Sequence, residues 1–274
     1  MSEPAGRLEL RAGDGRLIVD PEVGGRFASL EIDGHETLVT HGDGPIWWGC
    51  FPMAPFAGRI REGRLVFRGA THHLATNLPP HAIHGTVFGR PWQVVARGES
   101  RVVLSTDLGP GWPFPGRVTQ SVRLAPGGLD AELTLEADTP MPAWLGWHPW
   151  FRRRIADSAV VLDFEATRMY VRGPDGMPTG EVVHPTPGPW DDAFGGVGRP
   201  PRLTWPGVLR LEIASSASFW VVYDERDDAL CVEPQTAPPD AVNLAAAPEA
   251  EMPLAEPGRP VSVSMSWRWG RDGG

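Results

Sequence analysis

The chain has 274 residues, of which 41% are hydrophobic and 22% charged, as expected of an ordinary globular protein that buries a core. Its net charge of −9, from 25 basic and 34 acidic residues, argues against wholesale nucleic-acid binding. No stretch approaches the ~20 apolar residues of a membrane span, and the N-terminus has no basic-then-apolar signal.

Short predicted strands dominate the first half of the chain, and 33 glycines and 30 prolines over the whole chain supply turns. Apolar and β-branched runs between turn signals predict strands at 8–10, 16–19, 27–32, 45–51, 64–67, 92–96, 102–106 and 118–124. The segment 45–51 is too apolar for an alternating strand, so we expect it to be buried on both sides.

The clearest pattern lies in the segment 129–137, where apolar residues at odd positions alternate with Asp, Glu and Thr at even positions. A period of two means one buried face and one face in water. Further strands are predicted at 160–164, 168–171, 208–213, 219–223, 229–233 and 261–269. The segment 245–260, rich in Ala, Pro and Glu, is predicted as a loop. We therefore expect an all-β fold, a sandwich or barrel, in one domain spanning residues 1–274.

A single histidine lies within the aromatic run Gly146-Trp147-His148-Pro149-Trp150-Phe151. Because flat rings stack well on the apolar face of a sugar, we interpret this run, Trp147 included, as a sugar-binding wall with one proton-transfer group. The alternative is a core histidine whose nitrogens bond to the backbone. Pro149 favours the site, because proline removes a backbone donor and indicates a strand end, where sites are often built.

Glu233 ends the apolar strand predicted at 229–233 and precedes Pro234. A carboxylate in such a place must be paired, hydrogen-bonded or solvated. A structural ion pair with an arginine is the plain interpretation. The functional interpretation is an acid/base pair with His148, the two groups opening into one cavity on opposite sides of a bound pyranose.

Other polar residues could complete such a site. The fixed donors of Arg59 suit vicinal hydroxyls, although a surface arginine is equally consistent with the pattern. His81 and His84 lie in a loop framed by proline and glycine, which suits hydroxyl binding better than a metal site. Asp191 lies among aromatic residues, where it could bind sugar or cap a turn. The run 152–154, three arginines, reads as a solvated edge or a phosphate contact.

Taken in order, these pieces resemble the aldose 1-epimerase (galactose mutarotase) family and its neighbours, the hexose-phosphate epimerases. The matching elements are Gly58-Arg59-Ile60, His84-Gly85, Gly146–Phe151, Asp191-Asp192-Ala193-Phe194 and Glu233-Pro234-Gln235-Thr236. The His-Pro-aromatic-Phe and Glu-Pro-Gln-Thr elements are fairly specific in this order. The resemblance implies a large antiparallel β-sandwich of the galactose mutarotase type.

The resemblance also implies an isomerase, which interconverts the α and β anomers of a hexose by acid/base ring opening and closure. Glu233 would be the general base, ionised at neutral pH given its reference pKa of about 4.3, and His148 the general acid. Arg59, His84 and Asp191 would bind sugar hydroxyls. From the two most specific motifs we add Trp147 and Gln235 as sugar-binding residues. This chemistry requires no metal and no cofactor.

Two departures from the family pattern bear on the substrate. The family often has asparagine where this chain has Gly58, and a second glycine where it has Thr86. Two alternatives therefore stay open. The first is a hexose-6-phosphate mutarotase, with a cationic pocket made by 152–154 or by Arg59 with Arg61. The second is a non-catalytic sugar-binding module on the same fold.

We expect a small-molecule sugar as partner, with no nucleic acid and no membrane, and both monomer and dimer stay open. Cys50 and Cys231 lie far apart and make no metal motif. Interpreted as free thiols, they fit the cytosol, so the expected setting is cytoplasmic carbohydrate metabolism.

Overall fold

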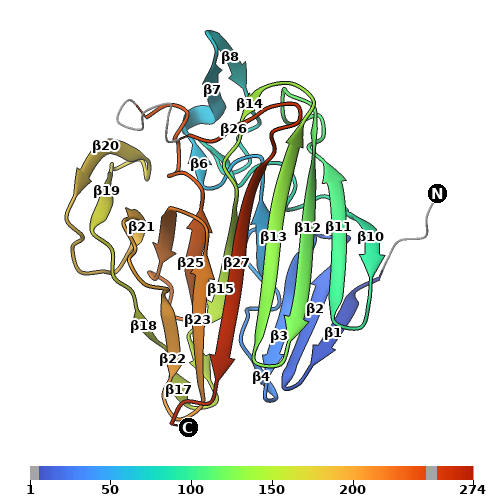
Figure 1. The fold of residues 1–274 in the computed structure, drawn as a ribbon. Coiled ribbons are helices and arrows are strands. Elements are labelled where there is room, and N and C mark those ends of the chain that lie inside the picture. Colours follow the sequence, from blue (N-terminus) through green and yellow to red (C-terminus); the bar gives the residue numbers. More distant parts are fainter. Residues whose placement is uncertain (1–5, 245–251, 274) are drawn as a thin grey trace.

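The computed structural model describes residues 6–244 and 252–273, and part of the loop predicted at 245–260 lies outside these residues. Within them the chain is almost entirely β (Figure 1). The one helical element there is a short 3-10 turn, η1 (Arg61–Gly63). No helix in the described part of the chain is long and apolar enough to cross a membrane. The prediction of an all-β fold is confirmed.

The first sheet has eleven antiparallel strands and carries the site described below. In hydrogen-bonded order they are β1 (Leu8–Ala12), β2 (Gly15–Asp20), β3 (Arg26–Ile32), β5 (Cys50–Met53), β15 (Gly146–Arg152), β25 (Ala229–Gln235), β24 (Phe219–Tyr223), β21 (Asp191–Gly195), β19 (Arg168–Arg172) and β20 (Pro178–Val183), with β4 (His35–Glu36) beside β3. Its central strands, β5, β15 and β25, therefore come from three distant parts of the sequence.

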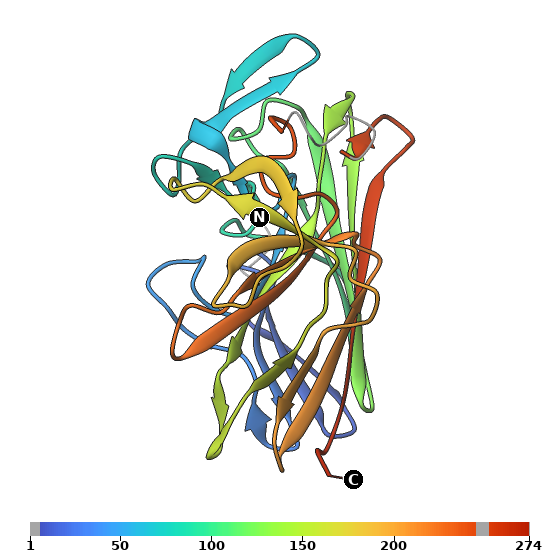
Figure 2. The same ribbon diagram turned by 90° about the vertical axis from the view of Figure 1, so that its left-hand side faces the viewer.

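The second sheet has eight antiparallel strands. Their order is β10 (Gln93–Arg97), β11 (Arg101–Asp107), β12 (Gly116–Ala125), β13 (Gly128–Ala137), β27 (Val261–Gly270), β23 (Leu209–Ser215), β22 (Arg202–Trp205) and β18 (Val161–Asp163). The two sheets face one another as layers, as the turned view shows (Figure 2).

Four small two-stranded ribbons complete the fold. They are β6 (Arg59–Ile60) with β9 (Ala82–Ile83), β7 (Arg64–Phe67) with β8 (Ala70–His73), β14 (Met141–Pro142) with β26 (Leu254–Ala255), and β16 (Arg154–Ile155) with β17 (Ser158–Ala159). The β7–β8 hairpin projects beyond one end of the sandwich (Figure 1). The β6–β9 ribbon holds one of the residues predicted to bind sugar, Arg59, and a second, His84, directly follows β9.

Alternation along the strands builds the core between the sheets. On β13 and β27 the apolar positions are buried and the Ser, Thr, Asp and Glu positions lie at the surface, as the period of two predicts. Trp267 of β27 crosses the gap and packs against Phe27 of β3 and Phe151 of β15, with ring centroids 6.1 and 5.1 Å apart. Burial of these large rings is what joins the two layers.

The segment 45–51 differs from its prediction. The strand begins only at Cys50, and residues 45–49 form a turn-rich loop rather than a doubly buried strand. Its apolar side chains have another use, since Ile46 and Trp47 line the cavity described next.

Candidate active site

A cavity of about 200 Å³ opens on the face of the first sheet that is turned away from the second. It is smaller than the ~300–1,000 Å³ of pockets that hold drug-sized ligands, so its size suits a small molecule. Its floor comes from β15, β24 and β25, and its sides from β19, β21 and several loops. Of the residues predicted to form the site, it brings together Arg59, His84, His148, Asp191, Glu233 and Gln235.

Trp147 is the predicted site residue that the structure places elsewhere. Successive side chains of a strand point to opposite faces, so His148 and Trp150 face the cavity while Trp147 faces the second sheet. Trp147 is fully buried there, and its Nε1–H donates to Oε1 of Gln120, 3.0 Å away on β12. The expectation that Trp147 contacts the ligand is corrected accordingly: the indole rings that line the cavity are those of Trp150 and Trp47.

His148 and Glu233 meet at the floor of the cavity. The antiparallel register pairs Gly146 with Gln235 and Trp150 with Cys231, which sets His148 opposite Glu233 on adjacent strands. His148 Nε2 lies 3.2 Å from Glu233 Oε1, and the two residues are only 6% and 2% exposed. They therefore lie side by side, and not on opposite sides of the space a pyranose would fill.

Burial sets the charge state of this pair. It raises the pKa of Glu233 well above its ordinary value, with a further rise from the charge of Asp191. Burial also lowers the pKa of His148 to about 3. Both shifts favour the neutral form of each group, so a single proton held by the pair belongs on the carboxyl. The reference pKa used to predict an ionised Glu233 does not apply in this environment.

Aromatic rings hold the His148 imidazole in place. The ring stacks with Phe51 of β5 at 4.8 Å and with Trp150 at 5.0 Å, at interplanar angles of 25° and 26°. The ring of His84 meets it edge-on at 4.8 Å. Behind Phe51, the fully buried Arg26 donates hydrogen bonds to three backbone carbonyls. The imidazole is therefore fixed in orientation relative to its carboxyl partner.

The β6–β9 ribbon brings Arg59 and His84 to one side of the cavity. Arg59 pairs with Ile83, and the next backbone bond runs from His84 N–H to the carbonyl of Gly58. His84 has φ +60° and Gly85 has φ +78°; a Cβ on Gly85 would lie 2.0 Å from a backbone oxygen. Glycine is therefore required at 85 for this turn, and the turn aims His84 at the cavity. Burial lowers the pKa of His84 well below its ordinary value, so the ring is neutral.

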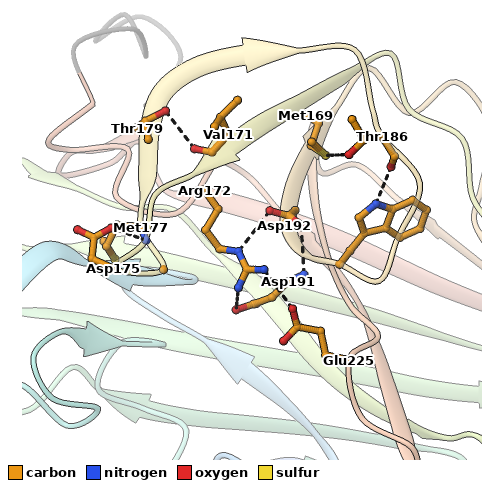
Figure 3. Close-up of polar contacts among 12 residues, drawn as sticks. Met169, Val171, Arg172, Asp175, Met177, Thr179, Thr186, Asp191, Asp192 and Glu225 are labelled. Atoms are coloured by element: carbon orange, nitrogen blue, oxygen red, sulfur yellow. Dashed lines mark hydrogen bonds and ion pairs between the residues drawn. The ribbon is translucent and has the colours of Figure 1, made fainter.

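A network of charged groups lines another part of the cavity, and most of it is drawn in Figure 3. Asp191 accepts from Arg59 at 3.4 Å and from Arg172 at 3.1 Å. Arg172, on β19, also contacts Asp192 at 3.5 Å and Glu225 at 3.1 Å. Burial raises the pKa of Asp191, and the two guanidinium charges oppose that rise. Arg172 lies at the centre of this network, yet no sequence motif indicated it.

Gln235 lies on the same face of β25 as Glu233, two residues away. Its Nε2–H donates to Glu233 Oε2 at 3.1 Å, which orients the carboxyl group. Three buried polar atoms of residues that line the cavity have no hydrogen-bond partner among the described residues: Gln235 Oε1, His84 Nδ1 and His148 Nδ1. Unsatisfied buried groups are rare in native proteins, so these atoms are consistent with a site that receives a polar ligand.

Comparisons with known proteins show the family of this chain. The family described as aldose 1-epimerase matches residues 6–194. The chain belongs to the aldose 1-epimerase family. An uncharacterized Escherichia coli protein, YphB, is 30% identical over 106 residues, a match that spans 37% of this chain and 36% of that protein.

Solved structures show the same aldose 1-epimerase fold. A galactose mutarotase-like protein from Clostridium acetobutylicum superposes with a TM-score of 0.86 at 17% identity, over 97% of this chain and 95% of its own. An aldose epimerase homologue from C. elegans gives 0.83 at 18% identity, over 97% and 99%. At these identities the likeness concerns the fold alone.

Two departures from the aldose 1-epimerase pattern have local structural reasons. Gly58 has φ +67°, and a Cβ there would lie 2.8 Å from Pro239. Thr86 donates its hydroxyl to the carbonyl of Leu108 at 2.7 Å. Gly58 lines the cavity, whereas Thr86 anchors the loop that follows His84.

The other candidate cations lie outside the lining of the cavity, although the neighbouring groove shares Trp47 with it. Arg152 and Arg154 line a separate groove, and Arg153 donates to backbone carbonyls near Arg226. Arg61 is paired with Asp175 and Asp240. None of the arginines at 152–154, nor Arg61, is among the residues that line the cavity.

Proposed function

We propose that this protein is a mutarotase, an aldose 1-epimerase that interconverts the α and β anomers of a free hexose. The observation that carries the proposal is the contact of 3.2 Å between His148 Nε2 and Glu233 Oε1 on the cavity floor. The anomeric hydroxyl oxygen and the ring oxygen of a pyranose are both bonded to C1. Two proton-transfer groups side by side can therefore reach both oxygens of one sugar.

The proposed chemistry moves two protons and breaks one bond. Glu233 takes the proton of the anomeric hydroxyl while His148 gives one to the ring oxygen, and the bond from C1 to the ring oxygen breaks. The open aldehyde rotates about C1–C2, and closure by the reverse transfers inverts C1. General acid and base groups each contribute about 10²–10⁴-fold in rate.

Burial favours the ring-opening direction of this proton transfer. Opening begins with Glu233 ionised and His148 protonated, and it ends with both groups neutral. The neutral form is the one that the buried site prefers, given the raised pKa of Glu233 and the lowered pKa of His148. The hydrogen bond from Gln235 and the charge of Arg59 lower the pKa of Glu233 and so support its ionised form. The contact between the pair provides the path by which the proton returns to His148.

The charges around the cavity favour a neutral sugar over a phosphorylated one. Among the described lining residues, two arginines, Arg59 and Arg172, face three carboxylates besides Glu233: Asp191, Asp192 and Glu225. Both guanidiniums are already bonded to these carboxylates. A phosphate dianion would have to displace them and would meet like charge. Arg59, Asp191 and His84 are instead arranged to bind hydroxyl groups.

Exchange NMR on glucose, galactose and glucose 6-phosphate would test this function. We expect the protein to accelerate exchange between the anomers of at least one free hexose and to act more weakly on the phosphate ester. A strong preference for glucose 6-phosphate would make the protein a hexose-6-phosphate mutarotase. Sugar binding without faster exchange would make it a binding module, and the acid/base assignment would then fail.

A further inference from the structure

Three side chains with metal-binding atoms converge at the cavity floor. His148, Cys231 and Glu233 each offer a ligand atom, and these atoms all lie within 4.8 Å of one another. All three residues are buried. Among the residues that the structure describes, this is the only group of three or more such side chains. We propose that the cluster is a zinc-binding site and that a bound Zn²⁺ blocks the acid/base pair.

The strand geometry fixes these three ligands together. Cys231 and Glu233 are two apart on β25, so their side chains project from the same face. His148 comes from the adjacent strand β15, opposite Glu233 in the register. Cys50, the other cysteine, is equally buried, but it lies on β5 opposite Pro149 of β15, one position out of phase with His148. Only one of the two thiols therefore belongs to the cluster.

The donor set selects the kind of ion. Zinc binds thiolate, imidazole and carboxylate ligands, whereas Mg²⁺ prefers an all-oxygen shell. With bond lengths of about 2.0–2.3 Å, a tetrahedral zinc places two of its ligands roughly 3.3–3.7 Å apart. Ligand atoms that lie within 4.8 Å of one another would therefore have to close by up to about 1 Å around the ion. Three protein ligands leave one position open, and the cavity is where a water or a sugar hydroxyl would fill it.

Occupation by zinc would stop proton transfer. The metal would take the lone pairs of His148 and Glu233 that the proposed reaction uses, so zinc binding and catalysis exclude one another. The site itself depends only on geometry. It can be tested by binding even if the protein proves to have no mutarotase activity.

Isothermal titration calorimetry with ZnCl₂ on untagged, reduced protein would test the site. We expect saturable binding of one Zn²⁺, no comparable binding of MgCl₂, and affinity weakened at least ~10–100-fold in Cys231→Ala, since losing even an outer partner of a metal ligand has effects of that size. The matched control is Cys50→Ala, which removes the same side chain from an equally buried position and should bind zinc like the wild type.

Two further measurements cover the case in which Cys231→Ala folds poorly. Cys231→Val keeps the volume of the core and should show the same loss of zinc affinity. The Co²⁺-loaded wild type should show a thiolate-to-cobalt charge-transfer band that disappears when ZnCl₂ is added. Absence of that band, or zinc binding by Cys231→Val as tight as in the wild type, would overturn the proposal. If anomer exchange is observed, ZnCl₂ should inhibit the wild type and Cys50→Ala but spare Cys231→Val.

Discussion

Replacing Glu233 by glutamine should separate the reaction from the stability of the fold. The substitution keeps the shape of the side chain and removes its ability to accept a proton. Loss of a general base lowers the rate by about 10²–10⁴-fold, which corresponds to about 3–5 kcal/mol in the activation free energy. The amide oxygen can still accept the hydrogen bond that Gln235 donates, so the local packing should persist.

The same substitution should change how stability depends on pH. Burial raises the pKa of Glu233 above its ordinary 4.5, so above pH 4.5 the native protein binds more protons at this residue than the unfolded chain does. Wild-type stability from this residue is therefore present at low pH and is lost as pH rises towards the native pKa. Glutamine does not titrate. The free energy of unfolding of Glu233→Gln, relative to that of the wild type, should therefore increase between pH 5 and pH 8.

Exchange NMR would measure the rates, and urea unfolding at pH 5 and pH 8 would measure the stabilities. Glu212→Gln on β23 is the matched control, because Glu212 is a half-exposed carboxylate on the other sheet, paired with Arg202. That variant should keep the wild-type rate and a stability within about 0.5 kcal/mol. A near-normal exchange rate in Glu233→Gln would refute its role as the base. A stability deficit that grows with pH would refute the assigned effect of burial.

Three further predictions concern His148 and the two tryptophans near it in β15. The active pair carries one proton, and binding of a second proton would inactivate it. Because burial lowers the pKa of His148 to about 3, this second proton binds only in strong acid, and the exchange rate should stay constant from pH 7 down to pH 5. A fall in the exchange rate near pH 6.5 would contradict this. Trp150→Ala should raise KM about tenfold, as expected for loss of about 1.5 kcal/mol of ring contact; an unchanged KM would remove Trp150 from the sugar wall. Trp147→Phe leaves the buried Gln120 Oε1 without its donor, so urea unfolding should show a loss of about 1–3 kcal/mol, while a changed KM would contradict its place outside the cavity.

The sequence by itself determined the fold class and most of the site. Alternation in segments such as 129–137 indicated strands with one buried face, because a period of two has few other structural meanings. The order of the motifs around Arg59, His84, His148, Asp191 and Glu233 pointed to one family, and these residues do line one cavity. Alternation also separates Trp147 from His148, since neighbours on a strand face opposite ways.

Only the tertiary structure decided which face meets the cavity and what surrounds each group. Arg172 and Asp191 form an ion pair between two different strands, β19 and β21. Cys231 lies near His148 because β25 and β15 are adjacent in the sheet. No local sequence pattern encodes either contact. The charge state of Glu233 likewise depends on burial, a property of the whole packed sheet and not of the residue.

Everything proposed about function depends on one feature of the packing: an imidazole and a carboxyl, both shielded from water, share the floor of a small polar cavity. A crystal structure with bound sugar in which C1 lies away from these two groups would leave the fold assignment intact and remove the proposed reaction. The sequence determines the strands because their periodicity is a local property of the chain. Only the tertiary structure decides the site, because side chains lose water and come together only after the sheets have packed.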